Sequence, residues 1–164
     1  MNFSNMGQFA EHLLLASAKE VLALHTGLEK CAQAIENTAK AELGTYQPET
    51  GPFQDWAELT DATKEDRMQQ GYTENDPLLR SGELRDSIQH ETGSLEAVIG
   101  STSPVMAYQE FGTGTIPPRP VLGPAAFRNK GKIQGILGAA MISGMFNGKK
   151  IHTSLGYDME VSGA

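Results

Sequence analysis

A repeating pattern of apolar and small residues near the start of the chain constrains the fold most strongly. The pattern occupies residues 4–43 and advances in alternating steps of three and four, the spacing of a helical seam with a period near 3.5. The seam consists of Ala10, Leu14, Ser17, Val21, Leu24, Leu28, Cys31 and Ile35. Ser4 or Asn5 can cap the start of this helix, and Gly44 suits its C-terminal end.

The length of this helix has a consequence for assembly. A helix of about 38 residues runs about 57 Å, which exceeds the diameter of a domain this small. We therefore expect part of the seam, with Leu14, Val21 and Leu28, to face another subunit. Gly27 lies inside the helix and lowers its stability by about 1 kcal/mol relative to alanine. A break at Gly27 that folds the helix back on its own domain is the alternative.

Shorter elements are expected after the helix. They are a loop at 44–58, a helix at 61–70 capped by Thr60 and ended by Gly71, a polar loop at 72–77, and one helical turn at 83–85. Two strand-like segments, 87–92 and 95–101, predict a hairpin joined by Gly93-Ser94, a two-residue connection suited to a type II′ turn. Leu95, Ala97 and Ile99 would share one face of the second strand.

Proline and glycine dominate the next part of the chain. Residues 104–111 predict a short helix or an extended piece, and the prolines at 117, 118 and 120 then force an extended path. Gly123-Pro124 opens a last helix that runs to about Phe146. Its small residues recur at steps of four and allow close approach of another backbone; they are Gly131, Gly135, Ala139 and Ser143. Residues 147–164 are expected to be a mobile tail or a segment ordered only on assembly.

Charge and cysteine content exclude several classes of protein. The net charge is −7, with 20 acidic and 13 basic residues, which argues against a protein that grips phosphate backbones. This balance suits ordinary solubility, or a wall past which nucleic acid slides without binding. Cys31 is the only cysteine, so it cannot form an intrachain disulfide; core packing and folding in a reducing cytosol are expected. Neither a signal peptide nor a membrane span is predicted.

The sequence contains no pattern typical of an active site. The four histidines, at 12, 25, 90 and 152, lack metal-ligand spacing, and Gly112-Thr113-Gly114 is better explained as a backbone turn than as a phosphate loop. A carboxylate pair of Glu110 with Glu91 or Glu96 has no support from spacing, so solvation at the surface is expected for all three. We therefore predict no catalytic residue, no metal and no cofactor.

Arg119 stands between Pro118 and Pro120, which stiffen its backbone. Two interpretations are open: an ion pair with a neighbouring subunit, or an intrachain pair with a carboxylate such as Glu110. Tyr108 and Phe111, which precede this segment, are expected in the core, with a contact role as the alternative.

Two segments carry a resemblance to a known family. Residues 106–128 contain Ala-Tyr, then Glu-Phe-Gly-Thr, then Pro-Pro-Arg-Pro-Val-Leu-Gly-Pro-Ala, which resembles the signature of tailed-bacteriophage neck and tail-completion proteins. Residues 77–88 read Pro-Leu-Leu-Arg-Ser-Gly-Glu-Leu-Arg-Asp-Ser-Ile and are similar to a second motif of that family. Val121 stands where the family usually has Phe, and Ser81 where Thr is common.

This resemblance implies an α+β domain over residues 1–146, in which a long N-terminal helix packs on a small antiparallel sheet with a closing helix. It implies a virion part, assembled in the host cytoplasm as a ring of six or twelve copies at the head–tail junction. The neighbours would be portal or adaptor and tail proteins, and DNA would pass through the channel without specific binding. The expected contact faces are the N-terminal seam and residues 112–122, because a ring needs two different complementary faces. The candidate contact residues next to and within the second face are Tyr108, Glu110, Phe111, Pro118, Arg119 and Pro120. Another phage tail, baseplate or head-decoration subunit is the main alternative; a small hydrolase using Glu110 or Tyr108 and a nucleic-acid-binding module are others.

Overall fold

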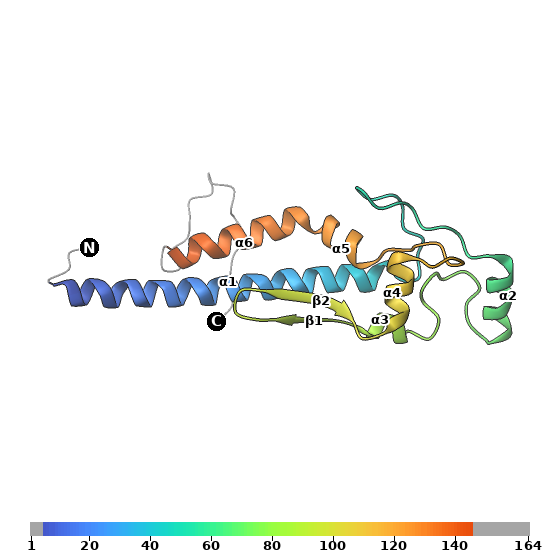
Figure 1. Cartoon of the computed structure of the whole chain (residues 1–164), viewed down its shortest axis with the longest axis horizontal. Helices are drawn as coiled ribbons and strands as arrows, with labels where there is room; N and C mark the ends of the chain where they lie inside the picture. Colours follow the sequence, from blue (N-terminus) through green and yellow to red (C-terminus); the bar gives the residue numbers. More distant parts are fainter. Residues whose placement is uncertain (1–4, 146–164) are drawn as a thin grey trace. The chain divides into compact units, whose positions relative to one another are not determined.

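The computed structural model describes residues 5–145 (Figure 1). Its elements are α1 (Met6–Glu42), α2 (Asp61–Gln69), α3 (Glu83–Asp86), β1 (Ile88–Thr92), β2 (Ala97–Ser101), α4 (Pro104–Phe111), α5 (Leu122–Arg128) and α6 (Lys130–Met145). The two strands pair with each other as a small antiparallel sheet. The α+β class, with a long N-terminal helix, a small sheet and a C-terminal helix, is confirmed.

Contacts divide the chain into two compact units, which are described separately below. The first unit draws on Met1–Ala32, Glu91–Ala97 and Gly131–Ala164, and the second on Gln33–His90 and Val98–Lys130. Helix α1 and the hairpin therefore contribute residues to both units. The single domain expected over residues 1–146 stays a prediction, and the tail expected at 147–164 lies outside the described residues.

Helix α1 has the extent that the seam predicts. Asn5 caps it, because its Oδ1 accepts a hydrogen bond from Gln8 N at 2.9 Å. The helix continues through Gly27 without interruption (Figure 1), so the predicted alternative of a break there is wrong. After the helix, Gly44 has a φ of 96° and its N–H donates to Pro77 O at 2.8 Å. A left-handed glycine thus ends the helix, as expected.

The first unit packs α1 closely against α6. A Cβ placed on Gly27 would lie 3.0 Å from Ala140 Cβ, and one on Gly144 only 2.6 Å from Glu20 Cα. Gly131, at the start of the predicted small-residue row, has nothing within 4 Å of a Cβ position. The residues of α6 closest to α1 therefore belong to the row of Ile136, Ala140 and Gly144, which lies one position further along the helix than the predicted row. Ile136 of this row is buried in the core.

The predicted single C-terminal helix is wrong, because α5 ends at Arg128 and α6 begins at Lys130. Asn129, at the break, is buried, and its Nδ2 donates to Ala125 O and to Thr38 Oγ1, both at 2.8 Å. An asparagine side chain that bonds backbone and neighbouring groups competes with helix continuation. Pro124 lies within the first turn of α5, as expected.

The hairpin forms where predicted, but its turn is displaced. Gly93 N donates to Glu96 O at 2.8 Å, so Ser94 and Leu95 are the central turn residues. Gly93 does not adopt the positive φ that a leading glycine of a type II′ turn requires. Leu95 is consequently exposed at the turn and not on the inner face of the second strand.

The other short elements agree with the sequence. Thr60 Oγ1 accepts from Thr63 N at the start of α2, and Gly71 ends that helix with a φ of 79°. Gly82 precedes the single turn of α3 with a φ of 93°. Residues 104–111 are helical, which resolves the alternative left open by the sequence.

Each unit has its own buried apolar side chains. Those of the first unit are Cys31, Ala32, Ile136, Ala139 and Ala140. Those of the second unit are Ala34, Ile35, Ala39, Leu43, Trp56, Ile88, Met106, Val121 and Ala125. Core packing of Cys31 is thus confirmed, and burial raises the pKa of its thiol.

Candidate functional site

Arg119 is the anchor of the proline-bracketed segment in the second unit. Only 6% of the residue is exposed, and its Nε and Nη2 donate to the carbonyl oxygens of Ala57 and Glu58 at 3.0 and 3.1 Å. Its backbone N donates to Gln109 O at 2.6 Å. Burial lowers the pKa of the guanidinium, which nevertheless keeps all its donors.

Both interpretations of Arg119 therefore need correction. The guanidinium binds backbone carbonyls of its own chain, so it neither pairs with Glu110 nor projects toward a neighbouring subunit. Sequence spacing could not reveal this, because the acceptors are main-chain groups some sixty residues away.

Glu110 has a structural role that the expectation of surface solvation missed. Its Oε2 accepts from Val121 N at 2.7 Å and Leu122 N at 3.1 Å, while Oε1 accepts from Gly123 N at 3.0 Å. A carboxylate on the first amides of a helix satisfies donors that lack helical partners. Glu110 thus ties the end of α4 to the start of α5.

Trp56 fixes the segment from a third direction. Its indole Nε1 donates to Pro120 O at 2.9 Å, and the side chain is buried. Pro118 is exposed and Pro120 is half-buried. Between the helix and the prolines, Gly112 has a φ of 71° and Thr113 N donates to Ile116 O at 2.9 Å, which confirms the expected backbone turn.

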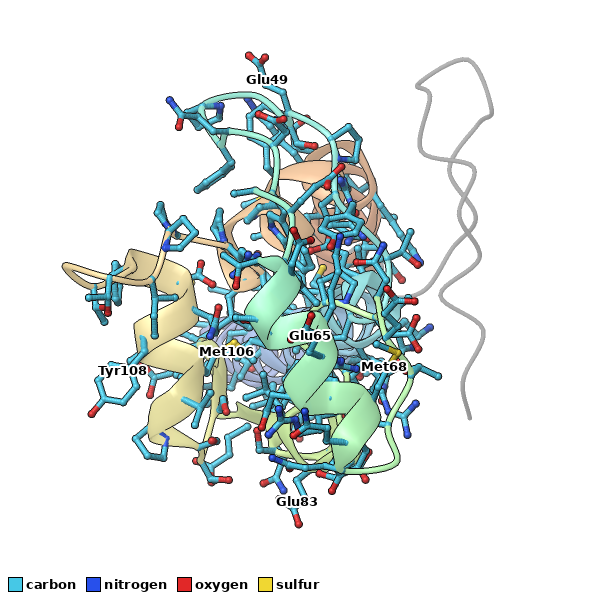
Figure 2. All side chains as sticks on the ribbon, turned by 90° about the vertical axis from the view of Figure 1, so that its right-hand side faces the viewer. Glu49, Glu65, Met68, Glu83, Met106 and Tyr108 are labelled. Carbon is cyan, nitrogen blue, oxygen red and sulfur yellow. The ribbon has the colours of Figure 1, made fainter. Side chains whose placement is uncertain are left out.

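Three side chains on one side of α4 are exposed on this fixed support. They are Val105 at 45%, Tyr108 at 54% and Phe111 at 83%, and we call them the α4 stripe. Figure 2 shows Tyr108 pointing away from the molecule, whereas Met106 lies on the inner side of α4 and is buried. The expectation that Tyr108 and Phe111 lie in the core is therefore wrong. Met106 is the buried residue of α4.

The apolar seam of α1 changes character along the helix. Cys31 and Ile35 are buried and Leu28 is half-buried, but Val21 is 42% and Leu14 is 71% exposed. The sequence predicted a continuous seam, but it did not indicate where along the helix the seam residues change from buried to exposed. The exposed part lies entirely within the first unit.

The sequence patterns did not predict an ion pair between the buried Glu42 and the more exposed Arg128 in the second unit. Glu42 is 3% exposed; its Oε1 accepts from Arg128 Nη1 at 2.8 Å, and its Oε2 is buried without a hydrogen-bond partner. Arg128 also donates to Gln47 Oε1 and Thr50 Oγ1. Burial, with a further contribution from Glu110, raises the pKa of Glu42 to about 7 against the lowering effect of Arg128.

His90 pairs with the carboxylate of Glu36 in the second unit. Its Nδ1 bonds Glu36 Oε2, while Lys40 Nζ lies 2.5 Å from Glu36 Oε1. The hydrogen bond from Lys40, followed by that from His90, holds the pKa of Glu36 below its usual value. Within residues 5–145 no group of three His, Cys, Asp or Glu side chains could hold a metal ion. Over the same described residues, no helix is long and apolar enough to cross a membrane.

Comparisons of the chain with protein-family models, with curated proteins and with solved structures find no match. The resemblance to phage neck proteins therefore depends on the two motifs alone. Among the described residues, the features suited to a contact are the exposed apolar surfaces of α4 and α1. The segment around Arg119 supports the first of them.

Proposed function

We propose that this chain is a structural subunit of a tailed-phage particle, and that copies of it form a ring at the head–tail junction. The observation that carries the proposal is the α4 stripe. Exposed aromatic side chains on a rigid backbone lose little conformational freedom on binding, which makes them effective contact residues. Phe111, at 83% exposed, is held in this way.

The polar anchors explain why the support is rigid. Arg119, Glu110 and Trp56 each connect the segment after α4 to another part of the second unit by hydrogen bonds. The backbone positions that carry the stripe are therefore held at a fixed spacing by the chain's own hydrogen bonds.

The roles of the motif residues also support the proposal. Gly82 and Gly112 adopt positive φ, Pro77 O accepts from Gly44 N, and Glu110 caps α5. The resemblance implies residues that serve turns and packing, and these residues do so. A ring in which each copy contacts the next needs such fixed, non-identical faces.

The partners follow from the same proposal. Copies of the chain would line a channel, with six or twelve as the numbers that the resemblance implies, between portal or adaptor proteins and tail proteins. The net charge of −7 suits a channel through which DNA passes without specific binding.

Assembly of the purified chain tests the proposal. Light scattering and electron microscopy at high protein concentration should show closed rings, and an antibody against the chain should label phage particles at the head–tail junction. Phe111→Asp with Tyr108→Asp should abolish rings, because charges would have to be buried at the contact. Met68→Asp is the matched control, since Met68 is also an exposed apolar side chain of the second unit, at 51%.

All variants should keep the circular dichroism spectrum of the unmodified chain, because the altered side chains lie in solvent. Rings that persist in the double variant, or antibody label elsewhere on the particle, would contradict the proposal.

A further inference from the structure

The exposed half of α1 has a pattern that is the same in both directions. Starting from Ala18, the residues three positions away are Leu15 and Val21, the residues four away are Leu14 and Leu22, and those seven away are Glu11 and His25. At 100° per residue these positions share one side of the helix, within an arc of roughly 120°. The two ends differ at two positions, because Leu15 is matched by Val21 and Glu11 by His25.

This side of the helix is apolar and lies in solvent. Leu14, Leu15 and Leu22 are 71%, 57% and 67% exposed, and Val21 is 42% exposed. Together with Ala18 they present on the order of 500 Å² of apolar surface, as large as the largest patch of a typical monomer. Such a patch indicates a contact with another macromolecule.

We propose that this face of α1 packs against the same face of a second copy, with the two helices antiparallel and a two-fold axis at Ala18. Leu14 would then contact Leu22 of the partner subunit, and Leu15 would contact Val21 of the partner subunit. Ala18 would meet Ala18 of the partner subunit. The small side chain at the axis lets the helices approach to about 8 Å.

Three arguments select a second copy as the occupant. A two-fold contact requires a self-complementary patch, and the pattern around Ala18 has that property. The carboxylate of Glu11 would lie opposite the imidazole of His25 of the partner subunit, at both ends of the contact, and can accept its N–H. Two such faces bury about 1,000 Å², which reaches the lower limit for a specific interface.

This contact is independent of the proposed ring. A ring repeats one face against a different face, whereas the α1 contact joins identical faces and closes with two copies. Substitutions in the α4 stripe should therefore leave the α1 pair intact.

Cysteine cross-linking tests the geometry. In the full chain with Cys31→Ala, which removes the native thiol, Ala18→Cys should form a disulfide between two copies under mild oxidation. Lys19→Cys is the matched control, because Lys19 is also an exposed residue but lies about 100° around the helix. The proposal expects at least a tenfold higher cross-linking yield at position 18. Equal yields, or no cross-link at position 18, would overturn it.

Charge exchange tests the antiparallel register. Leu14→Lys alone and Leu22→Glu alone should each weaken the dimer by about 100-fold in Kd, measured by sedimentation, because each buries two unpaired charges. Leu14→Lys combined with Leu22→Glu should recover most of that loss, because each lysine then faces a glutamate. A double variant as weak as the single ones rules out this register. Both sites are exposed, so circular dichroism should be unchanged in all three.

Discussion

In the second unit, the segment around Arg119 is held by side chains and main-chain groups that lie far apart in the sequence. Arg119 reaches the carbonyls of Ala57 and Glu58, and Arg128 reaches Glu42. In the first half of α1, by contrast, the side-chain hydrogen bonds of Asn5 and Ser17 join residues three apart. Its leucines face solvent. The segment is thus held by groups of its own chain, whereas the helix has an apolar face that no other residue among 5–145 covers.

The comparison teaches that the two exposed surfaces suit different kinds of contact. Helix α4, next to the anchored segment, presents the aromatic side chains of Tyr108 and Phe111, which suits a specific contact. The α1 face presents a continuous aliphatic surface, which suits helix packing. Variants in the two regions should therefore have opposite effects on the monomer and on assembly.

The largest effect is expected at Arg119. Arg119→Ala should lower the free energy of unfolding by about 3 kcal/mol, because the buried guanidinium loses its hydrogen bonds to the carbonyls of Ala57 and Glu58 and its removal opens a cavity. Urea unfolding of the monomer measures this loss. Arg85→Ala, at an exposed arginine of α3, should change the same quantity by less than about 0.5 kcal/mol. Similar losses for both variants would mean that the segment is not anchored as described.

An intermediate effect should appear in the pH dependence of stability. The pKa of Glu42 is about 7 in the folded chain, against 4.5 in the ordinary group. Between these values the folded chain binds a proton that the unfolded chain has released. The contribution of Glu42 to stability is therefore full below about pH 4.5 and is lost as the pH rises through 7. We expect a loss of about 2 kcal/mol over this pH range.

The difference between the unmodified chain and Glu42→Gln isolates this contribution, because glutamine does not titrate. It also cancels the opposite effect of Glu36, whose lowered pKa adds stability at higher pH. Urea unfolding from pH 4.5 to 8 should show the slope in the unmodified chain relative to the variant. Parallel pH profiles would contradict the burial of an ionisable Glu42.

The smallest effect is expected on the exposed seam. Leu14→Gln should change the free energy of unfolding by less than about 0.5 kcal/mol at submicromolar concentration, where copies are separate. Ile35→Val, on the buried part of the same seam, should lower it by about 1 kcal/mol despite the smaller chemical change. If Leu14→Gln destabilised the dilute monomer more than Ile35→Val, the contrast between the two parts of the seam would fail.

Elements that depend on local chemistry could be predicted from the sequence. The 3.5-residue seam predicted α1, Thr60 predicted the start of α2, and Gly44 and Gly71 predicted helix ends at glycines with positive φ. Each of these signals acts within one or two helical turns, so neighbouring residues suffice to determine it.

Partners that are distant in sequence could not be predicted in the same way. The sequence suggested a carboxylate for Arg119 because unlike charges attract, but the fold supplied two carbonyls. The sequence predicted a continuous helix through Asn129, but the Asn129 side chain donates hydrogen bonds to Thr38 Oγ1 and Ala125 O at a break between two helices. It suggested core positions for Tyr108 and Phe111 from their aromatic character, but Met106 occupies the inner side of α4.

The sequence by itself determined the length of α1 and the turns at glycine, because backbone preference and apolar spacing are local properties, whereas the α+β class was expected from the resemblance of two motifs. Only the tertiary structure decided which part of the seam is covered, and which partners Glu110, Glu42 and Arg119 have. The reason is that burial and hydrogen-bond satisfaction depend on groups brought together from distant parts of the chain, and residue spacing along one element carries no information about them.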